Sequence, residues 1–261
     1  MAHGCRLYRS RIIRISDSSF TKYFWTFLSL VSYTDKMISF QNVTVKYPLG
    51  NIALDSISFD VEDQEFIYLV GPSGAGKTTI LRLLLNDTKL TEGSILIDDM
   101  EITPAKFKQV AELRQKIGVV FQDFKILLDD NVYENVALSM RIKNYHPSEI
   151  KKQVTESLQL TGIEDKMYQF PAQLSAGELQ RVAIARAVVG DRRIILADEP
   201  TGNLDPKTTW EVMKIFKELE KTKTILFATH NTDIVNSMKR RVITLKNGKM
   251  IKDKKKGGYE L

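Results

Sequence analysis

Cysteine, histidine and long apolar runs are all scarce in this sequence. Cys5 is the only cysteine among 261 residues, which excludes a disulfide within the chain and fits a reducing compartment. The three histidines are scattered, and no cluster with metal-ligand spacing is present. The apolar stretch at residues 23–31 falls well short of the roughly 20 residues that a membrane-spanning helix needs. The length suits one large α/β domain, or one core with a subdomain.

The positive charge of the chain lies mainly at its two ends. Residues 1–36 hold six Lys or Arg against two Asp, and residues 246–256 hold six Lys against one Asp, whereas the whole chain carries +6. The part between them is close to neutral, which argues against a broad nucleic-acid-binding face. The basic tail, with Lys252, Lys254, Lys255 and Lys256, is either a contact for anionic lipid or a solvated terminus.

The first 36 residues differ in character from the rest. Several arginines precede the apolar stretch as in a signal peptide, yet no small-residue cleavage site follows. Residues 38–47 then begin an alternating pattern that is typical of a strand. We therefore expect residues 1–36 to be a dispensable leader, with Met37 as the start of the functional protein.

A glycine-rich loop follows an apolar run, residues 66–70, that we predict to be a buried strand. The loop fits the pattern G-x-x-x-x-G-K-[ST] and consists of Gly71, Pro72, Ser73, Gly74, Ala75, Gly76, Lys77 and Thr78. Its glycines permit a tight turn that aims backbone N–H groups at a polyphosphate, and the helix that follows adds partial positive charge. We expect Lys77 to reach the β- and γ-phosphates and the Thr78 hydroxyl to bind Mg²⁺. The alternative is a chance glycine-rich turn between a strand and a helix.

The rest of the pattern predicts an α/β fold with a mixed β core, an antiparallel β subdomain and a helical subdomain. Residues 38–47 and 57–61 alternate as half-exposed antiparallel strands do. Short apolar runs typical of buried strands occupy residues 117–121, 194–197 and 224–229. Helices are predicted over residues 105–116, from Pro147 to about Gly162, from Ser175 to about Val189, and over 208–221.

Ser175 and Glu178 have the Ser-x-x-Glu spacing of a capping box at the start of a predicted helix. A helix N-terminus with free N–H groups can also bind an anion. Taken alone, the stretch is equally consistent with an ordinary capped helix.

Two adjacent carboxylates, Asp198 and Glu199, follow a predicted strand at the end where parallel sheets bind ligands. Asp198 can hold Mg²⁺ directly or through water, and Glu199 can orient and deprotonate an attacking water. The alternative is a solvated turn. His230 follows the next predicted strand at the same sheet edge, which favours contact with a γ-phosphate over a purely structural role.

Taken together, these stretches resemble the ATP-binding subunit of an ABC system over residues 37–250. The resemblance implies a P-loop ATPase that uses ATP and Mg²⁺, with Glu199, His230, Lys77 and Gln122 taking part in catalysis. Asn203, Leu204 and Asp205 correspond to the family's D-loop. The resemblance implies that Tyr47 stacks on adenine. The other residues implied to bind nucleotide are Gly71, Pro72, Ser73, Gly74, Ala75, Gly76, Lys77, Thr78, Thr79, Ser175, Gly177 and Glu178. Those implied to hold metal are Thr78, Gln122 and Asp198.

The resemblance also implies partners. In that family two ATPase domains sandwich two nucleotides between them. The signature segment of each domain, residues 174–178 here, completes the nucleotide site of the other domain. Because this chain has one copy of each motif, the resemblance implies a homodimer. Ala176 stands where the family usually has glycine. A polytopic membrane subunit would hold the chain at the cytoplasmic face of the membrane. Asp123, Phe124 and residues 126–128 would line its docking groove, with core packing between subdomains as the alternative.

Within the family, residues 118–124, 132–137 and 196–205 look most like the ATPases of bacterial cell division. In that branch, ATP-driven closure is passed through a membrane protein to cell-wall hydrolases, and nothing is transported. The alternatives are the ATPase of a lipoprotein-releasing or macrolide exporter, and an ATP-gated scaffold with incidental turnover. We expect the ATPase domain to span residues 37–250, with a helical subdomain at about 123–190 and a basic tail at 251–261.

Overall fold

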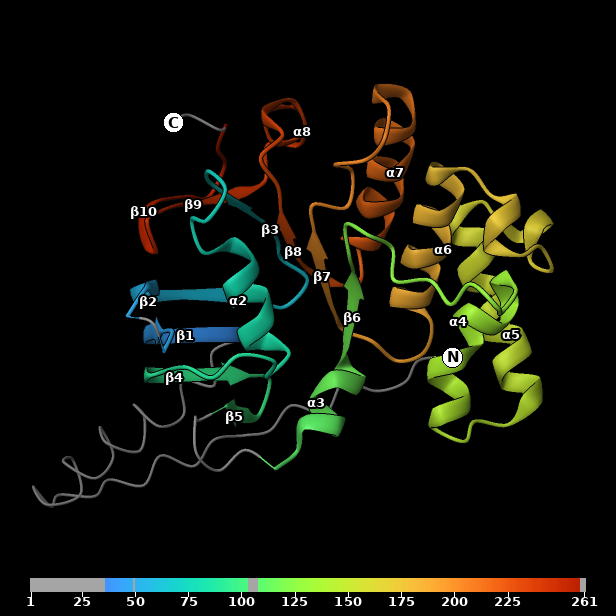
Figure 1. Ribbon diagram of the computed structural model, residues 1–261, viewed down its shortest axis with the longest axis horizontal. Coiled ribbons are helices and arrows are strands. Elements are labelled where there is room, and N and C mark those ends of the chain that lie inside the picture. The colour runs from blue at the N-terminus through green and yellow to red at the C-terminus, as the bar shows by residue number, and fades with distance from the viewer. Residues whose placement is uncertain (1–35, 49, 103–107, 259–261) are drawn as a thin grey trace, which may run out of the picture. The chain divides into compact units, whose positions relative to one another are not determined.

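The computed structural model describes residues 36–48, 50–102 and 108–258. The predicted leader lies outside these residues except for Lys36, which begins the first strand. Two sheets and two groups of helices make up the described part of the chain (Figure 1). None of its helices is long and apolar enough to cross a membrane.

The larger sheet has six strands in the order β10-β9-β3-β8-β7-β6. Neighbours from β9 to β6 are parallel, and β10 pairs antiparallel with β9, so the predicted mixed core is confirmed. Strands β3, β7 and β8 are continuous apolar runs because both faces of this sheet are covered. The strands are β3 (Phe66–Val70), β6 (Ile117–Val120), β7 (Ile194–Asp198), β8 (Thr224–Ala228), β9 (Arg241–Lys246) and β10 (Lys249–Lys254).

The smaller sheet is fully antiparallel, with the order β2-β1-β4-β5. Its strands are β1 (Lys36–Lys46), β2 (Ile52–Glu62), β4 (Glu92–Ile97) and β5 (Met100–Ile102). Helix α2 (Lys77–Leu84) belongs to one apolar cluster with both sheets, which explains why it is apolar nearly all round. That cluster fixes the helix directly behind the glycine-rich loop.

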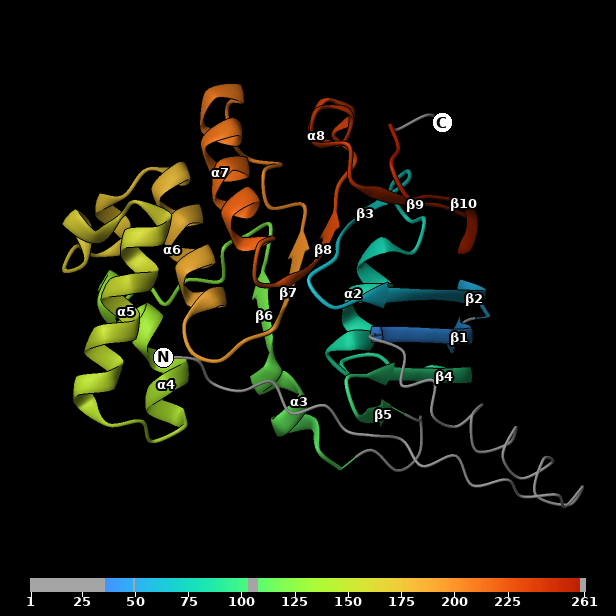
Figure 2. The ribbon, with the colours of Figure 1, turned by 180° about the vertical axis from the view of Figure 1, so that it is seen from behind.

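Helices α4 to α8 lie on the far side of the six-stranded sheet from the antiparallel sheet (Figures 1 and 2), whereas α3 (Val110–Lys116) contributes to the apolar cluster that the two sheets share. Helices α6 (Ala176–Val188), α7 (Pro206–Leu219) and α8 (Thr232–Met238) pack on this face. Helices α4 (Val132–Ile142) and α5 (Pro147–Thr161) form a separate apolar cluster with α6. Short 3₁₀ turns, Glu164–Lys166 and Pro171–Gln173, connect α5 to α6.

Local signals in the sequence place several helix ends correctly. Helix α5 begins at Pro147 and ends before Gly162, whose φ of 66° is the left-handed conformation that terminates helices. Ser175 and Glu178 form the predicted capping box of α6. These two helices therefore begin where their cap chemistry requires.

One predicted helix start is wrong, and a strand runs past the predicted end of the domain. Helix α3 (Val110–Lys116) begins later than residue 105, with no side-chain cap at Gln109; residues 103–107 lie outside the described part. The sheet also continues past the predicted domain boundary at residue 250. Arg241 of β9 donates from Nε and Nη2 to the two carboxylate oxygens of Asp253, at 2.9 and 2.7 Å, which joins β10 to its neighbour through side chains as well as backbone. Part of the predicted basic tail is therefore a strand.

Candidate nucleotide site

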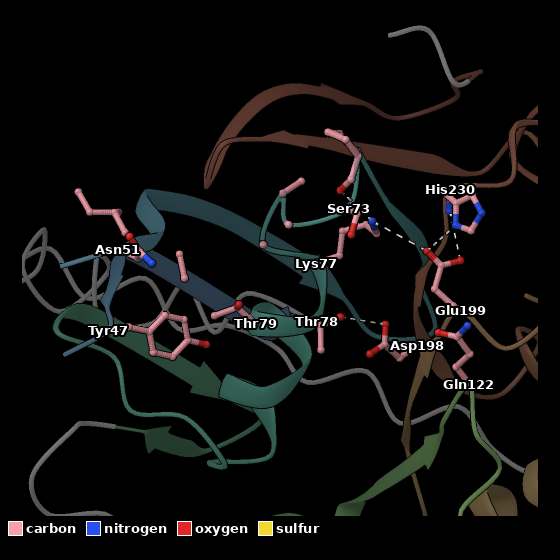
Figure 3. A pocket seen from close by; sticks show the side chains of 16 residues that line it. Tyr47, Asn51, Ser73, Lys77, Thr78, Thr79, Gln122, Asp198, Glu199 and His230 are labelled. Carbon is pink, nitrogen blue, oxygen red and sulfur yellow. Dashed lines mark hydrogen bonds and ion pairs between the residues drawn. The ribbon is translucent and has the colours of Figure 1, made fainter. Parts of the chain in front are cut away.

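A pocket of about 810 Å³ opens at the carboxyl ends of the parallel strands (Figure 3). Tyr47 lies at one end of it, and Glu199 and His230 lie at the other. The pocket brings together most residues that the sequence singled out. Its lining consists of Tyr47, Asn51, Ile52, Ala53, Pro72, Ser73, Gly74, Ala75, Gly76, Lys77, Thr78, Thr79, Gln122, Asp198, Glu199 and His230.

The glycine-rich loop needs glycine for two separate reasons. Gly74 and Gly76 have φ of 76° and 110°, which side chains disfavour. Gly71 has φ of 148°, and a Cβ there would lie 2.2 Å from the Leu245 carbonyl oxygen of β9. Gly71 is the one loop residue of the predicted set outside the pocket lining, and its lack of a Cβ lets the loop pass against β9.

Lys77 is buried beneath the loop and holds it closed. Its ammonium donates to the carbonyl oxygens of Gly71 at 2.8 Å and Pro72 at 3.2 Å. It also lies 3.9 Å from Glu199 Oε1. The positive charge therefore lies between the loop and the Glu199 carboxylate.

Thr78 and Asp198 meet across the pocket, where Thr78 Oγ1 donates to Asp198 Oδ1 at 3.2 Å (Figure 3). Burial raises the pKa of Asp198, the charge of Glu199 adds to this, and the hydrogen bond from Thr78 opposes it. With Gln122 in the same lining, the available donors are hydroxyl, carboxylate and amide oxygens.

This donor set fits Mg²⁺, which takes hard oxygen ligands and shares its coordination with phosphate and water. Among the described residues no group of three or more His, Cys, Asp or Glu side chains could hold a metal by itself. A metal here would be held jointly by the protein and by a bound phosphate.

Glu199 and His230 form the polar end of the pocket. Glu199 Oε1 lies 2.9 Å from His230 Nδ1, and the His230 backbone N–H donates to Oε2 at 3.4 Å. The Glu199 side chain is 15% exposed and the His230 ring 69% exposed, so the ring can move while the carboxylate is shielded. Glu199 has φ of 48°, a left-handed conformation that costs about 1–2 kcal/mol. Such strain is typical of functional positions.

Three lining residues, Asn51, Ile52 and Ala53, were not predicted. Asn51 belongs to the turn between β1 and β2, which also carries Tyr47, and Ile52 and Ala53 begin β2; the Tyr47 N–H donates to the Asn51 carbonyl at 2.9 Å. No motif identifies them, because their place in the lining follows from how the antiparallel sheet packs against α2. The turn signal at Gly50 and Asn51 was the only clue.

Ser175, Gly177 and Glu178 do not reach this pocket. They line a second hollow of about 310 Å³ at the start of α6. Glu178 Oε2 accepts hydrogen bonds from the Ser175 N–H and hydroxyl, at 2.8 Å each, while Oε1 pairs with Lys166. A Cβ on Gly177 would lie 2.4 Å from Cγ2 of Thr208, so glycine allows α6 to approach α7. One chain alone does not join its two predicted nucleotide-binding segments.

Comparison with known proteins gives consistent matches. The family model described as ABC transporter matches residues 54–202. The chain is 47% identical to the cell division ATP-binding protein FtsE of Bacillus subtilis (strain 168), over 85% of this chain and 98% of that protein. It is 44% identical to the FtsE of Streptococcus pneumoniae serotype 2 (strain D39), over 85% of this chain and 97% of that protein. A solved dimer of the ATP-binding cassette MJ0796, in a post-hydrolysis state bound to ADP and Pi, is similar with a TM-score of 0.77 and 34% identity, over 85% of this chain and 100% of that chain.

The pH dependence of stability tests whether the charged Glu178 carboxylate stabilises the start of α6. Its hydrogen bonds, first from Lys166 and then from Ser175, lower its pKa from 4.5 to about 2. Because the folded pKa lies below the unfolded one, the stabilisation is complete above pH 4.5 and is lost as the pH falls toward 2. We expect Glu178→Gln, which keeps the capping geometry, to lower the thermal unfolding midpoint at about pH 7 and to differ less from wild type below about pH 4.

Thermal unfolding followed by circular dichroism between about pH 3.5 and 7 measures this difference. Glu156→Gln is the control, since Glu156 is an exposed glutamate on α5. A difference between Glu178→Gln and wild type that stays constant across this pH range would contradict the assignment.

Proposed function

Because this chain belongs to the ABC transporter family, we propose that it is the ATP-hydrolysing subunit of a membrane complex that acts in bacterial cell division. It is an ATPase of the ABC type. The observation that carries the proposal is the convergence of the phosphate loop with Asp198, Glu199 and His230 in one pocket. The cell-division role is supported by the relatives named FtsE, which match along 97–98% of their own length.

The residues follow one another along the pocket in the order in which the parts of ATP would bind. Tyr47, at the end remote from the carboxylates, would stack on adenine, and the N–H groups of the loop would bind the phosphates. Lys77 would contact the β- and γ-phosphates as a point charge. When bound through Thr78, Asp198 and Gln122, Mg²⁺ would neutralise negative charge on the phosphates.

Hydrolysis would take place at the Glu199 end. Glu199 accepts a proton from a water whose oxygen bonds to the γ-phosphorus, and the bond from that phosphorus to the β–γ bridging oxygen breaks, releasing ADP and phosphate. His230 orients the carboxylate through the 2.9 Å contact, and Gln122 fixes the position of the attacked phosphate. The shielded position of Glu199 keeps the proton transfer away from bulk solvent.

The separation of the two predicted nucleotide-binding segments supports a homodimer. Ser175 and Gly177 lie outside the chain's own pocket, so they would complete the pocket of a second copy, and the MJ0796 cassette is itself dimeric. Glu178 would act there through Ser175, because both of its carboxylate oxygens are already engaged. Ala176 adds one methyl group beside this contact.

The loop after Gln122 supports a membrane partner. Leu127 and Leu128 are 42% and 74% exposed next to Asp123 and Phe124, an apolar surface of the kind that partner proteins cover. We propose that an FtsX-like polytopic subunit docks there and holds the chain peripherally at the cytoplasmic face of the membrane. An exporter of the lipoprotein-releasing or macrolide type would dock on the same surface, so the identity of the recovered membrane subunit distinguishes the two functions.

Replacement of the proposed base tests the ATPase mechanism. Glu199→Gln keeps the shape of the side chain but removes the proton acceptor, so we expect turnover to fall by about 10²- to 10⁴-fold. ATP should then accumulate in a stable dimer, detectable by size-exclusion chromatography with light scattering. Glu218→Gln, an exposed change on α7, should leave both readouts at wild-type values. Normal hydrolysis by Glu199→Gln would reject the assigned role. If instead the variant forms the ATP-bound dimer and the membrane complex still works without hydrolysis, the chain is an ATP-gated scaffold.

Affinity purification from detergent-solubilised membranes tests the partner. We expect the tagged full chain to recover an FtsX-like protein, and Leu128→Asp to reduce that recovery without loss of the chain's own ATPase activity. Leu160→Asp, at an exposed leucine on α5, is the matched control. Recovery of an exporter permease instead would establish the alternative function.

We also propose that the lysines at positions 252 and 254–256 contact anionic lipid once the chain is docked, on the grounds of their charge. Replacing these four lysines with glutamine should weaken co-sedimentation with vesicles that contain phosphatidylglycerol, and the effect should vanish at high salt. Equal sedimentation of both proteins would leave these lysines with a solvated role only.

A further inference from the structure

The loop that carries Gln122 contains an unusual bend. Phe124 and Lys125 have φ of 57° and 52°, two consecutive left-handed conformations in residues that carry side chains. Their carbonyl oxygens point to the same side chain on α6. Arg186 donates from Nη2 to the Phe124 oxygen at 2.6 Å and from Nη1 to the Lys125 oxygen at 2.5 Å. One guanidinium therefore holds both carbonyls of the bend.

The charge of Arg186 has no acidic partner among the described residues. Burial lowers its pKa from the usual arginine value, and no neighbouring carboxylate opposes this shift. A half-buried guanidinium needs its N–H groups satisfied, and the two loop carbonyls do this. The planar fork of arginine presents two separate N–H groups in fixed geometry to the two carbonyls, whereas lysine would have to reach both from one nitrogen on a flexible chain.

A second polar anchor holds the same loop from α4. Asn135 is fully buried; its Oδ1 accepts from the Leu127 N–H at 2.8 Å, and its Nδ2 donates to the Leu127 oxygen at 2.9 Å. Both anchors belong to the helical group formed by α4, α5 and α6. Gln122 itself is attached on the other side, since Asn203 Nδ2 donates to its carbonyl oxygen at 3.1 Å.

We propose that Arg186 is a positioning residue for ATP hydrolysis, because it fixes the bend at Phe124 and Lys125 and so sets where Gln122 enters the pocket. This inference rests on the proposed ATPase function. Helix α6 carries Ser175 at its start and Arg186 near its end, about 16 Å apart along the axis. Binding of the second copy's nucleotide at Ser175 would therefore be linked to the position of Gln122 in this chain, because one rigid helix joins the two ends.

The test compares Arg186→Met with Arg192→Met in the full chain. Arg192 is also buried enough to lower its pKa and also donates to backbone carbonyls, those of Val189 and Ile117, but it does not touch the loop. We expect Arg186→Met to lower kcat by about 10- to 100-fold with little change in KM, because the phosphate loop is untouched. Hydrogen exchange of the Phe124, Lys125 and Leu127 amides should accelerate, and Arg192→Met should change neither readout.

Arg186→Lys keeps the charge and loses the fork, so it should show the same direction of change even if Arg186→Met does not fold. Unchanged kcat and unchanged exchange in the Arg186 variants would overturn the inference. If kcat falls equally in the Arg186 and Arg192 variants, in proportion to a lower unfolding temperature, the role of Arg186 is purely structural and the inference is also overturned. If wild type itself hydrolyses no ATP, the proposed function fails, and the exchange measurement alone still decides whether Arg186 holds the loop.

Discussion

The register of three parallel strands is the constraint on which the site depends. Leu69 of β3 and Asp198 of β7 both pair with Ala228 of β8, so these strands end at the same level. The glycine-rich loop directly follows β3, Asp198 ends β7 with Glu199 next to it, and His230 follows the end of β8 by two residues. Groups separated by up to about 160 positions in the sequence therefore share one pocket because backbone hydrogen bonds align their strands.

The sequence was sufficient wherever the cause of a feature is local. The phosphate loop, the buried strands, the capping box at Ser175 and the stop at Gly162 follow from patterns only a few residues long, and the structure has them where predicted. The start of α3 and the extent of β10 were not predictable in the same way. The Asn247–Gly248 turn indicates that a strand follows, but no local pattern gives its length, because Arg241 ties β10 into place by pairing with Asp253 across the hairpin and with Glu65 in a distant segment.

Residues whose function depends on distant backbone were missed for the same reason. Asn135 and Arg186 look like ordinary helix residues, and their meaning appears only when the loop after Gln122 is folded against them. Gly71 stays a predicted nucleotide contact, and the structure adds that it lies against β9, where only a residue without a Cβ lets the loop pass. Sequence patterns thus identified the groups that face a ligand better than the groups that hold those residues in place.

The position of β10 has a consequence for self-association of the folded protein. This strand forms one edge of the six-stranded sheet, and an unpaired edge is a template on which a strand of another molecule can add. Lysine occupies positions 249, 252 and 254 of this strand, and Lys249 forms an ion pair with Asp55 at 3.3 Å. A lysine-rich edge strand disfavours the addition of a further strand, and this edge has that composition whether or not a membrane is near.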